Sequence, residues 1–120
     1  MLTHRGFSAW IVSNGAPIDE YLVTVDEKNH CVSCWVPGDE GRVSVHSATT
    51  SAGSHESQTF SVHWRDHGSR IDSCGFISLD GFVVPGRFLL GDGETSRQGV
   101  RTGNATERPF VFGRVEAPGD

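Results

Sequence analysis

The residues best suited to chemistry lie in one short run, His63-Trp64-Arg65-Asp66-His67. Imidazole and carboxylate groups bind transition metals and carry protons near neutral pH. A further imidazole would join them if the chain on either side of residues 47–57 pairs as a hairpin. The sequence thus predicts a candidate metal or proton-transfer site with these members: His46, His63, Asp66 and His67. The competing interpretation, a solvated histidine before a turn, is the more common situation.

The segment Cys31-Val32-Ser33-Cys34 has the spacing of a zinc-ligand pair, and His30 and Cys74 could complete a set of four ligands. On a strand, however, side chains three positions apart point to opposite faces and lie about 10 Å apart. That separation suits neither a disulfide nor a shared metal unless the segment turns. We therefore expect no zinc and three free, buried cysteines. Their odd number also favours a reducing compartment.

No nucleophile stands out in the sequence. A Gly-x-Ser-x-Gly elbow is absent, and no cysteine lies in an obviously electropositive setting. Gly91-Asp92-Gly93 lacks the third glycine and the following helix of a dinucleotide-binding loop. We accordingly expect no catalytic residue, no cofactor and no enzymatic activity.

The tryptophans are candidates for binding. Trp64 shares one face of an alternating strand with Phe60 and Val62, which predicts that it is buried. Trp35 is out of phase with its apolar neighbours, so it either meets a second layer or is exposed. An exposed tryptophan packs on sugar rings or anchors a protein interface. Trp35 is therefore a candidate ligand-binding residue.

The charge is unevenly distributed. The net charge of −5 argues against nucleic acid as a partner, because phosphate contacts need a basic surface. Five arginines nevertheless fall within residues 87–114. Among them Arg97 and Arg101 are candidates for docking an acidic partner, since arginine grips carboxylate or phosphate through two bonds. The alternative is that these arginines flank strands and pair with acidic residues elsewhere in the chain.

The composition indicates one all-β domain over residues 1–120. The chain has 15 glycines, one lysine and only 21% charged residues, which suits short strands and tight turns better than surface helices. No apolar run approaches the roughly 18 residues of a membrane span, and no basic, apolar leader opens the chain. We expect no membrane segment and a cytoplasmic or nuclear location.

Hydrophobic alternation predicts eight strands, with hairpin turns at Asn14-Gly15 and Asp80-Gly81. Pro85 and Gly86 predict an edge strand or a bulge. Residues 91–108 are expected to form a long polar loop and residues 47–57 a mobile one. The predicted strands cover residues 7–12, 18–25, 31–36, 42–46, 60–65, 71–79, 82–90 and 109–115. A two-sheet antiparallel β-sandwich of about eight strands is expected, and a partly open barrel is the alternative.

Short motifs recur in order over nearly the whole chain: Gly6-Phe7-Ser8-Ala9-Trp10-Ile11, Asn14-Gly15, Glu20-Tyr21, Cys34-Trp35-Val36 with a turn at Gly41, Asp80-Gly81 and Arg108-Pro109-Phe110-Val111-Phe112. In order and spacing they resemble an uncharacterised domain family of mushroom-forming fungi that has no assigned function. Members of that family are often longer, with a charged C-terminal extension. The resemblance implies a β fold and the core of a longer protein. It brings no catalytic or ligand residues.

Three functional hypotheses follow. The first is a non-enzymatic binding or protein-interaction module whose partner is another protein or a second copy. The second is a small cytoplasmic lectin-like defence protein that binds carbohydrate, and the third is a metal-dependent enzyme using surface His and Asp. Trp35 exposed beside Asp, Asn or Arg in a concave site would favour the lectin. An uncovered edge strand or a flat apolar patch would favour protein interaction.

Overall fold

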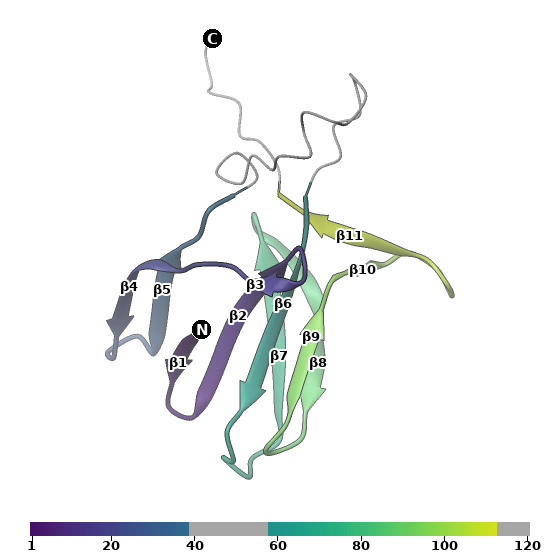
Figure 1. Cartoon of the computed structure of the whole chain (residues 1–120). Coiled ribbons are helices and arrows are strands. Elements are labelled where there is room, and N and C mark those ends of the chain that lie inside the picture. Colours follow the sequence, from purple (N-terminus) through teal and green to yellow (C-terminus); the bar gives the residue numbers. More distant parts are fainter. Residues whose placement is uncertain (39–57, 113–120) are drawn as a thin grey trace.

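The computed structural model describes residues 1–38 and 58–112, and all the regular structure in these two ranges is β-strand (Figure 1). The predicted all-β class is therefore confirmed. Within the same ranges no helix has the length and hydropathy that a membrane span needs. The described strands are β1 (Leu2–His4), β2 (Phe7–Ser13), β3 (Ala16–Pro17), β4 (Tyr21–Asp26), β5 (Cys31–Trp35), β6 (Thr59–Asp66), β7 (Ser73–Leu79), β8 (Phe82–Leu89), β9 (Glu94–Arg97), β10 (Gly99–Arg101) and β11 (Glu107–Val111).

The main sheet is organised around β6. Strand β2 pairs with one side of β6, and β9 and β11 pair with the other side, all antiparallel. Strand β2 itself lies between β1 and β6, as its two apolar faces predict. The described part of the sheet does not close into a barrel. The structure is thus consistent with the predicted sandwich.

Three tight turns join neighbouring strands. Arg5-Gly6, Asn14-Gly15 and Asp80-Gly81 each have positive φ at both residues, with values of 50° and 83°, 56° and 76°, and 50° and 84°. Positive φ at both central residues defines the hairpin turn whose twist matches the flanking strands. The Asn14-Gly15 and Asp80-Gly81 turns confirm their predictions, whereas the Arg5-Gly6 turn and β1 were not predicted. The second glycine, which tolerates positive φ, was the available sequence signal.

A second layer covers one face of the main sheet. The β7–β8 hairpin lies behind β6 and β9 in Figure 1, and its inner face contributes the buried Val84 and Leu89. Trp64 of β6 lies against the backbone of Gly75 in β7. Trp64 as a whole is half-buried, but its Nε1 is fully enclosed. The prediction that Trp64 is buried is thus confirmed for its Nε1, while the residue as a whole is only half-buried between the layers.

Aromatic rings extend this core toward β11. Phe60 and Phe110 are cross-strand partners with ring centroids 5.5 Å apart. The ring of Phe112 stacks on Phe60 at 4.6 Å. Directly opposed aromatic pairs stabilise a sheet beyond the area that they bury. The end of β11 is thereby fixed to the start of β6.

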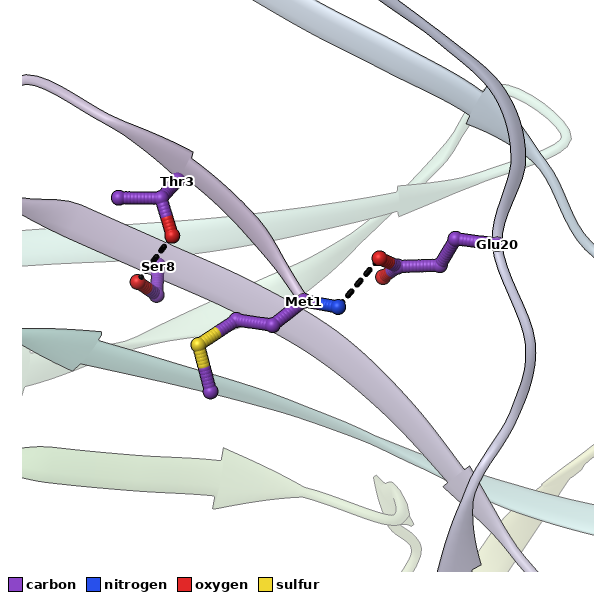
Figure 2. A network of polar contacts seen from close by, with 4 residues as sticks. All are labelled: Met1, Thr3, Ser8 and Glu20. Atoms are coloured by element: carbon purple, nitrogen blue, oxygen red, sulfur yellow. Dashed lines mark hydrogen bonds and ion pairs between the residues drawn. The ribbon is translucent and has the colours of Figure 1, made fainter.

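The β4–β5 hairpin forms a separate two-stranded sheet with β5 beside β1. Polar contacts link it to the start of the chain. The Met1 amino group bonds to the carboxylate of Glu20, just before β4, as Figure 2 shows. Glu27, in the hairpin turn, lies 3.9 Å from His4 Nδ1 and 3.8 Å from the Arg5 guanidinium. In each ion pair at least one of the two partners is largely exposed to solvent. The ion pairs therefore orient the hairpin but add little to the free energy of unfolding.

The chain leaves the main sheet earlier than predicted. Residues 18–25 were expected to pair with residues 7–12, but only Ala16–Pro17 does so. The last ladder contact is the bond from the Ile18 amide to the Ile11 carbonyl at 3.0 Å. Ile18 is buried, at 8% exposure, and anchors the chain where it turns away. Strand β4 then pairs with β5 instead.

Residues 91–108 differ most from the prediction of a long polar loop, because they contain β9 and β10. Backbone pairing needs no apolar side chain, so polar composition did not exclude strands here. Thr95 of β9 lies opposite Trp64, and Gly99 of β10 is buried beneath Arg108 of β11. The predictions for residues 42–46 and 47–57 lie outside the described residues.

Candidate binding surfaces

The three described members of the predicted metal site each have a separate partner. His63 stacks on Trp10, with ring centroids 5.6 Å apart, and its Nε2 lies 2.8 Å from Ser61 Oγ. Asp66 is fully buried and accepts bonds from the amide and hydroxyl of Ser69. Successive strand residues face opposite sides, so the carboxylate of Asp66 and the imidazole of His63 do not share a face.

No group of three or more His, Cys, Asp or Glu side chains in residues 1–38 and 58–112 is arranged to hold a metal ion. His46, the fourth candidate, lies outside these ranges. The metal hypothesis thus stays a prediction that the described residues do nothing to support. The hydroxyl and amide of Ser69 instead hold the pKa of the Asp66 carboxyl below its usual value, against the opposing effect of burial.

Ser8 and His67 form a polar pair that sequence reasoning missed. His67 Nε2 lies 2.7 Å from Ser8 Oγ, which is the contact of a nucleophile with its base. Ser8 is only 2% exposed, however, and its hydroxyl also lies 2.8 Å from Thr3 Oγ1 (Figure 2). Asp66 is occupied by Ser69 and does not orient the imidazole. The pair is best explained as a structural link between the residues after β6 and the β1–β2 hairpin.

The cysteines are free, as expected, but Cys31 and Cys74 are exposed and not buried. This part of the prediction was wrong because both lie on hairpin faces that the described residues leave uncovered. Cys34 is half-buried on the opposite face of β5 from Cys31. Burial raises the pKa of the Cys34 thiol, and the nearby Glu20 carboxylate raises it further.

The two candidate arginines have different environments. Arg97 is half-buried, and its Nη2 donates to the Gly86 carbonyl of β8 at 3.3 Å. Its buried Nε has no hydrogen-bond partner among the described residues. Arg101 is exposed and donates to the carbonyls of Gly103 and Asn104, each at 3.2 Å. Arg97 thus joins the two layers, while Arg101 binds its own turn.

The outer face of the β7–β8 hairpin, directed away from the main sheet, is apolar. Cys74 lies opposite Phe88, and Ser78 lies opposite Val83. The ring of Phe76 lies across Gly86, where a β-carbon would come within 2.9 Å of it. The members of this outer face, Cys74, Phe76, Ser78, Val83 and Phe88, are all exposed and uncharged.

One face of the β4–β5 hairpin carries the exposed Trp35. Its cross-strand partner is Tyr21, and the next pair on the same face is Thr24 opposite Ser33. Tyr21 and Thr24 share this face because the register shifts between them, with Leu22 at a φ of 53°. In a regular strand Tyr21 would instead share its face with Val23 and Val25, and Thr24 would lie on the opposite face. We call the face formed by Tyr21, Thr24, Ser33 and Trp35 the aromatic face.

A cleft of about 440 Å³ opens where the turn after β2, the start of β6 and the β10–β11 pair meet. Its lining includes Asn14, Ser61, Gln98 and Glu107 around the ring of Phe60. The volume lies within the range of small-molecule sites. None of the residues predicted to bind a ligand lines this cleft, and Trp35 lies on an open hairpin face instead.

Comparisons with models of protein families, with curated proteins and with solved structures found no match to this chain. The resemblance to a fungal domain family therefore stays a prediction.

Proposed function

We propose that this chain is a non-enzymatic interaction module that binds a second copy of itself through the outer face of the β7–β8 hairpin. The observation that carries the proposal is the exposure of three large apolar side chains on this one face. Phe76 is 68% exposed, Val83 59% and Phe88 82%. Single exposed apolar residues are normal on proteins, whereas a contiguous group marks an interaction site.

The size of the patch supports an interface. The three side chains leave on the order of 400 Å² of apolar surface in water, which matches the largest patches on monomeric proteins. A standard interface buries about 800 Å² on each partner. The patch therefore supplies the apolar centre of such an interface, and the rest of the hairpin supplies its rim. Burial of this area contributes roughly 10 kcal/mol before the entropic cost of association is subtracted.

The uncharged outer face is where a second copy can dock without bringing like charges together. The chain carries a net charge of −5, so two copies repel each other in most orientations. On the outer face, none of Phe76, Ser78, Val83 and Phe88 has an acidic or basic side chain. Two copies that meet there bring no like charges together. Such a self-complementary patch is what a two-fold symmetric dimer requires.

The backbone favours face-to-face packing over extension of the sheet. Strand β8 pairs only with β7 among the described strands, so no described strand extends the sheet at its other edge. Pro85 in the middle of β8 has no amide to donate, and the register shifts opposite it. Both features interrupt an edge that would otherwise recruit a further strand. We therefore expect the second copy to pack against the side chains of the outer face and not to extend the sheet.

The test is sedimentation velocity over a wide range of protein concentration. We expect the parent protein to dimerise and Phe88→Ser to weaken the dimer at least tenfold, because truncating a central aromatic side chain costs about 2 kcal/mol or more. Leu22→Ser is the matched control, since Leu22 is 77% exposed but lies on β4. It should dimerise like the parent.

Two results would contradict the proposal. One is a parent protein that stays monomeric up to its solubility limit. The other is a dimer that Phe88→Ser and Leu22→Ser weaken equally. Cys74 gives a second readout, because it lies in the same face opposite Phe88. In a Cys31→Ser/Cys34→Ser background, mild oxidation should yield a disulfide-linked dimer that Phe88→Ser suppresses.

A further inference from the structure

The aromatic face of β4–β5 differs in chemistry from the outer face of β7–β8. Trp35 is 72% exposed and Tyr21 54%, so both rings offer a face to a ligand. Directly opposed residues have β-carbons about 5 Å apart, so the two aromatic side chains start from adjacent positions on one face. Such a surface suits the C–H groups of a flat, partly apolar ring.

Polar groups continue the face next to the two rings. The hydroxyls of Thr24 and Ser33 lie 2.8 Å apart, and either can donate to the other. The Tyr21 hydroxyl donates to Asp19 Oδ2 at 3.4 Å, so the carboxylate of Asp19 lies at the rim of the aromatic pair. A carboxylate accepts several hydrogen bonds at once, and Asp19 is exposed.

These polar groups favour a saccharide over a protein partner. A protein that covered the aromatic pair would also desolvate Thr24, Ser33 and Asp19, which costs free energy unless each finds a partner. A sugar carries donor and acceptor hydroxyls beside its apolar ring face, and it can satisfy the same groups that it covers.

Charge narrows the class of sugar. Asp19 lies at one end of the aromatic face, and Asp26 lies opposite Cys31 at the other. The oxygens of Asp26 are engaged by Asn29, through its amide at 3.2 Å and its side chain at 2.7 Å, but the group remains an exposed anion. Two carboxylates repel uronic acids and sulfated sugars. Neutral sugars fit the face.

We infer that the aromatic face of the β4–β5 hairpin is a binding site for neutral saccharides, with Trp35 and Tyr21 stacking on the sugar ring and Asp19 accepting bonds from its hydroxyls. This site lies on a different hairpin from the proposed dimer face, so an experiment can disprove either proposal and leave the other standing.

Affinity electrophoresis in gels that contain a soluble polysaccharide tests this inference. The probes are a neutral β-glucan (laminarin), a neutral mannan and the acidic polysaccharide heparin. We expect at least one neutral polysaccharide to retard the parent protein and heparin to leave it unretarded. Trp35→Ala should weaken binding roughly tenfold, because stacking on an aromatic ring is the main contact. Asp19→Asn should weaken it less, since the amide still accepts from a hydroxyl.

Phe82→Ala is the matched control, because Phe82 is an exposed aromatic residue on the other hairpin and does not belong to the outer face proposed for the dimer. It should be retarded like the parent. Circular dichroism should show that Trp35→Ala keeps the parent's β spectrum, since Trp35 is mostly exposed. Absence of retardation by both neutral polysaccharides would overturn the inference. So would equal retardation of parent and Trp35→Ala, or retardation by heparin alone.

Discussion

The indole of Trp64 lies directly on the backbone of Gly75, so a β-carbon at residue 75 would come within 2.8 Å of Nε1 and 2.9 Å of Cε2. This contact joins the main sheet to the β7–β8 hairpin. Glycine is required at residue 75 by close approach of a side chain and not by an unusual backbone angle, since no positive φ occurs there.

Gly75→Ala should therefore lower the free energy of unfolding by about 1–3 kcal/mol, the usual cost of overpacking a core contact. Chemical denaturation measures this change. Gly38→Ala is the control, because no described atom lies within 4 Å of its added β-carbon. In a Trp64→Phe background, which removes Nε1, the cost of Gly75→Ala should shrink. An unchanged cost would mean that the two residues are not in contact.

Asp66 should make stability depend on pH in the acid range. Its pKa is lowered in the folded protein by the hydroxyl and amide of Ser69, so the folded state binds fewer protons than the unfolded state. The resulting stabilisation is complete above the ordinary value of 3.8 and is lost as pH falls through the lower folded value. Asp66→Asn should destabilise the protein at neutral pH, and the difference from the parent should narrow below about pH 4.

Ser69→Ala provides a second check on Asp66, because it removes the side-chain bond that contributes most to the lowered pKa. It should reduce the acid dependence in part, with the amide bond remaining. Thermal unfolding at a series of pH values measures both variants. A parent and an Asp66→Asn protein that stay equally far apart at every pH would contradict the assignment.

The three cysteines should differ in reactivity toward a thiol reagent. Cys31 and Cys74 are exposed in the single chain, so at protein concentrations below dimerisation both should react quickly in the folded protein. Cys34 should react slowly, because burial and the Glu20 carboxylate raise its pKa and reduce the thiolate fraction. Glu20→Gln should speed the slow phase, and Cys34→Ser should abolish it. Three equal native rates would contradict this account.

Substitution of the two candidate arginines by alanine should lower the free energy of unfolding by different amounts. Arg97→Ala removes the bond to the Gly86 carbonyl between the layers and should cost about 1.5 kcal/mol. Arg101→Ala should change stability by less than about 0.5 kcal/mol, because its bonds lie within an exposed turn. Denaturant midpoints measure both changes. The reverse order would mean that Arg101, and not Arg97, joins the layers.

Strong local patterns were the predictable part of the fold. The alternation around Phe60, Val62 and Trp64 located β6, and Asp80-Gly81 located the β7–β8 turn. Pro85 predicted an edge or a bulge, and β8 is an edge strand opposite a register shift. These signals are local because side-chain period and turn conformation depend on a few adjacent residues.

Non-local pairing was not predictable. Strand β9 is polar and forms because β6 offers it a backbone ladder, while β3 ends after two residues because Ile18 turns inward. Among the surface residues, Trp35 was predictable as a binding candidate because it is out of phase with the apolar residues of its strand. Its partner Tyr21 was not, because the register shift at Leu22 leaves no clear sequence signal. The exposure of Phe76 and Phe88 depends on which side of the hairpin the main sheet covers.

The arrangement of turns also sets the order of folding. The β7–β8 hairpin closes through two adjacent residues, Asp80 and Gly81, and such hairpins form in about 1–10 μs. Strand β2 pairs with β6 across a long intervening sequence, from Val12 with Ser61 to Phe7 with Asp66, and sheets built from distant pairings form in milliseconds to seconds. The hairpin therefore forms and reopens with its inner apolar face in water before the main sheet covers that face. During that interval newly made chains can capture one another, so the yield on refolding should fall as protein concentration rises.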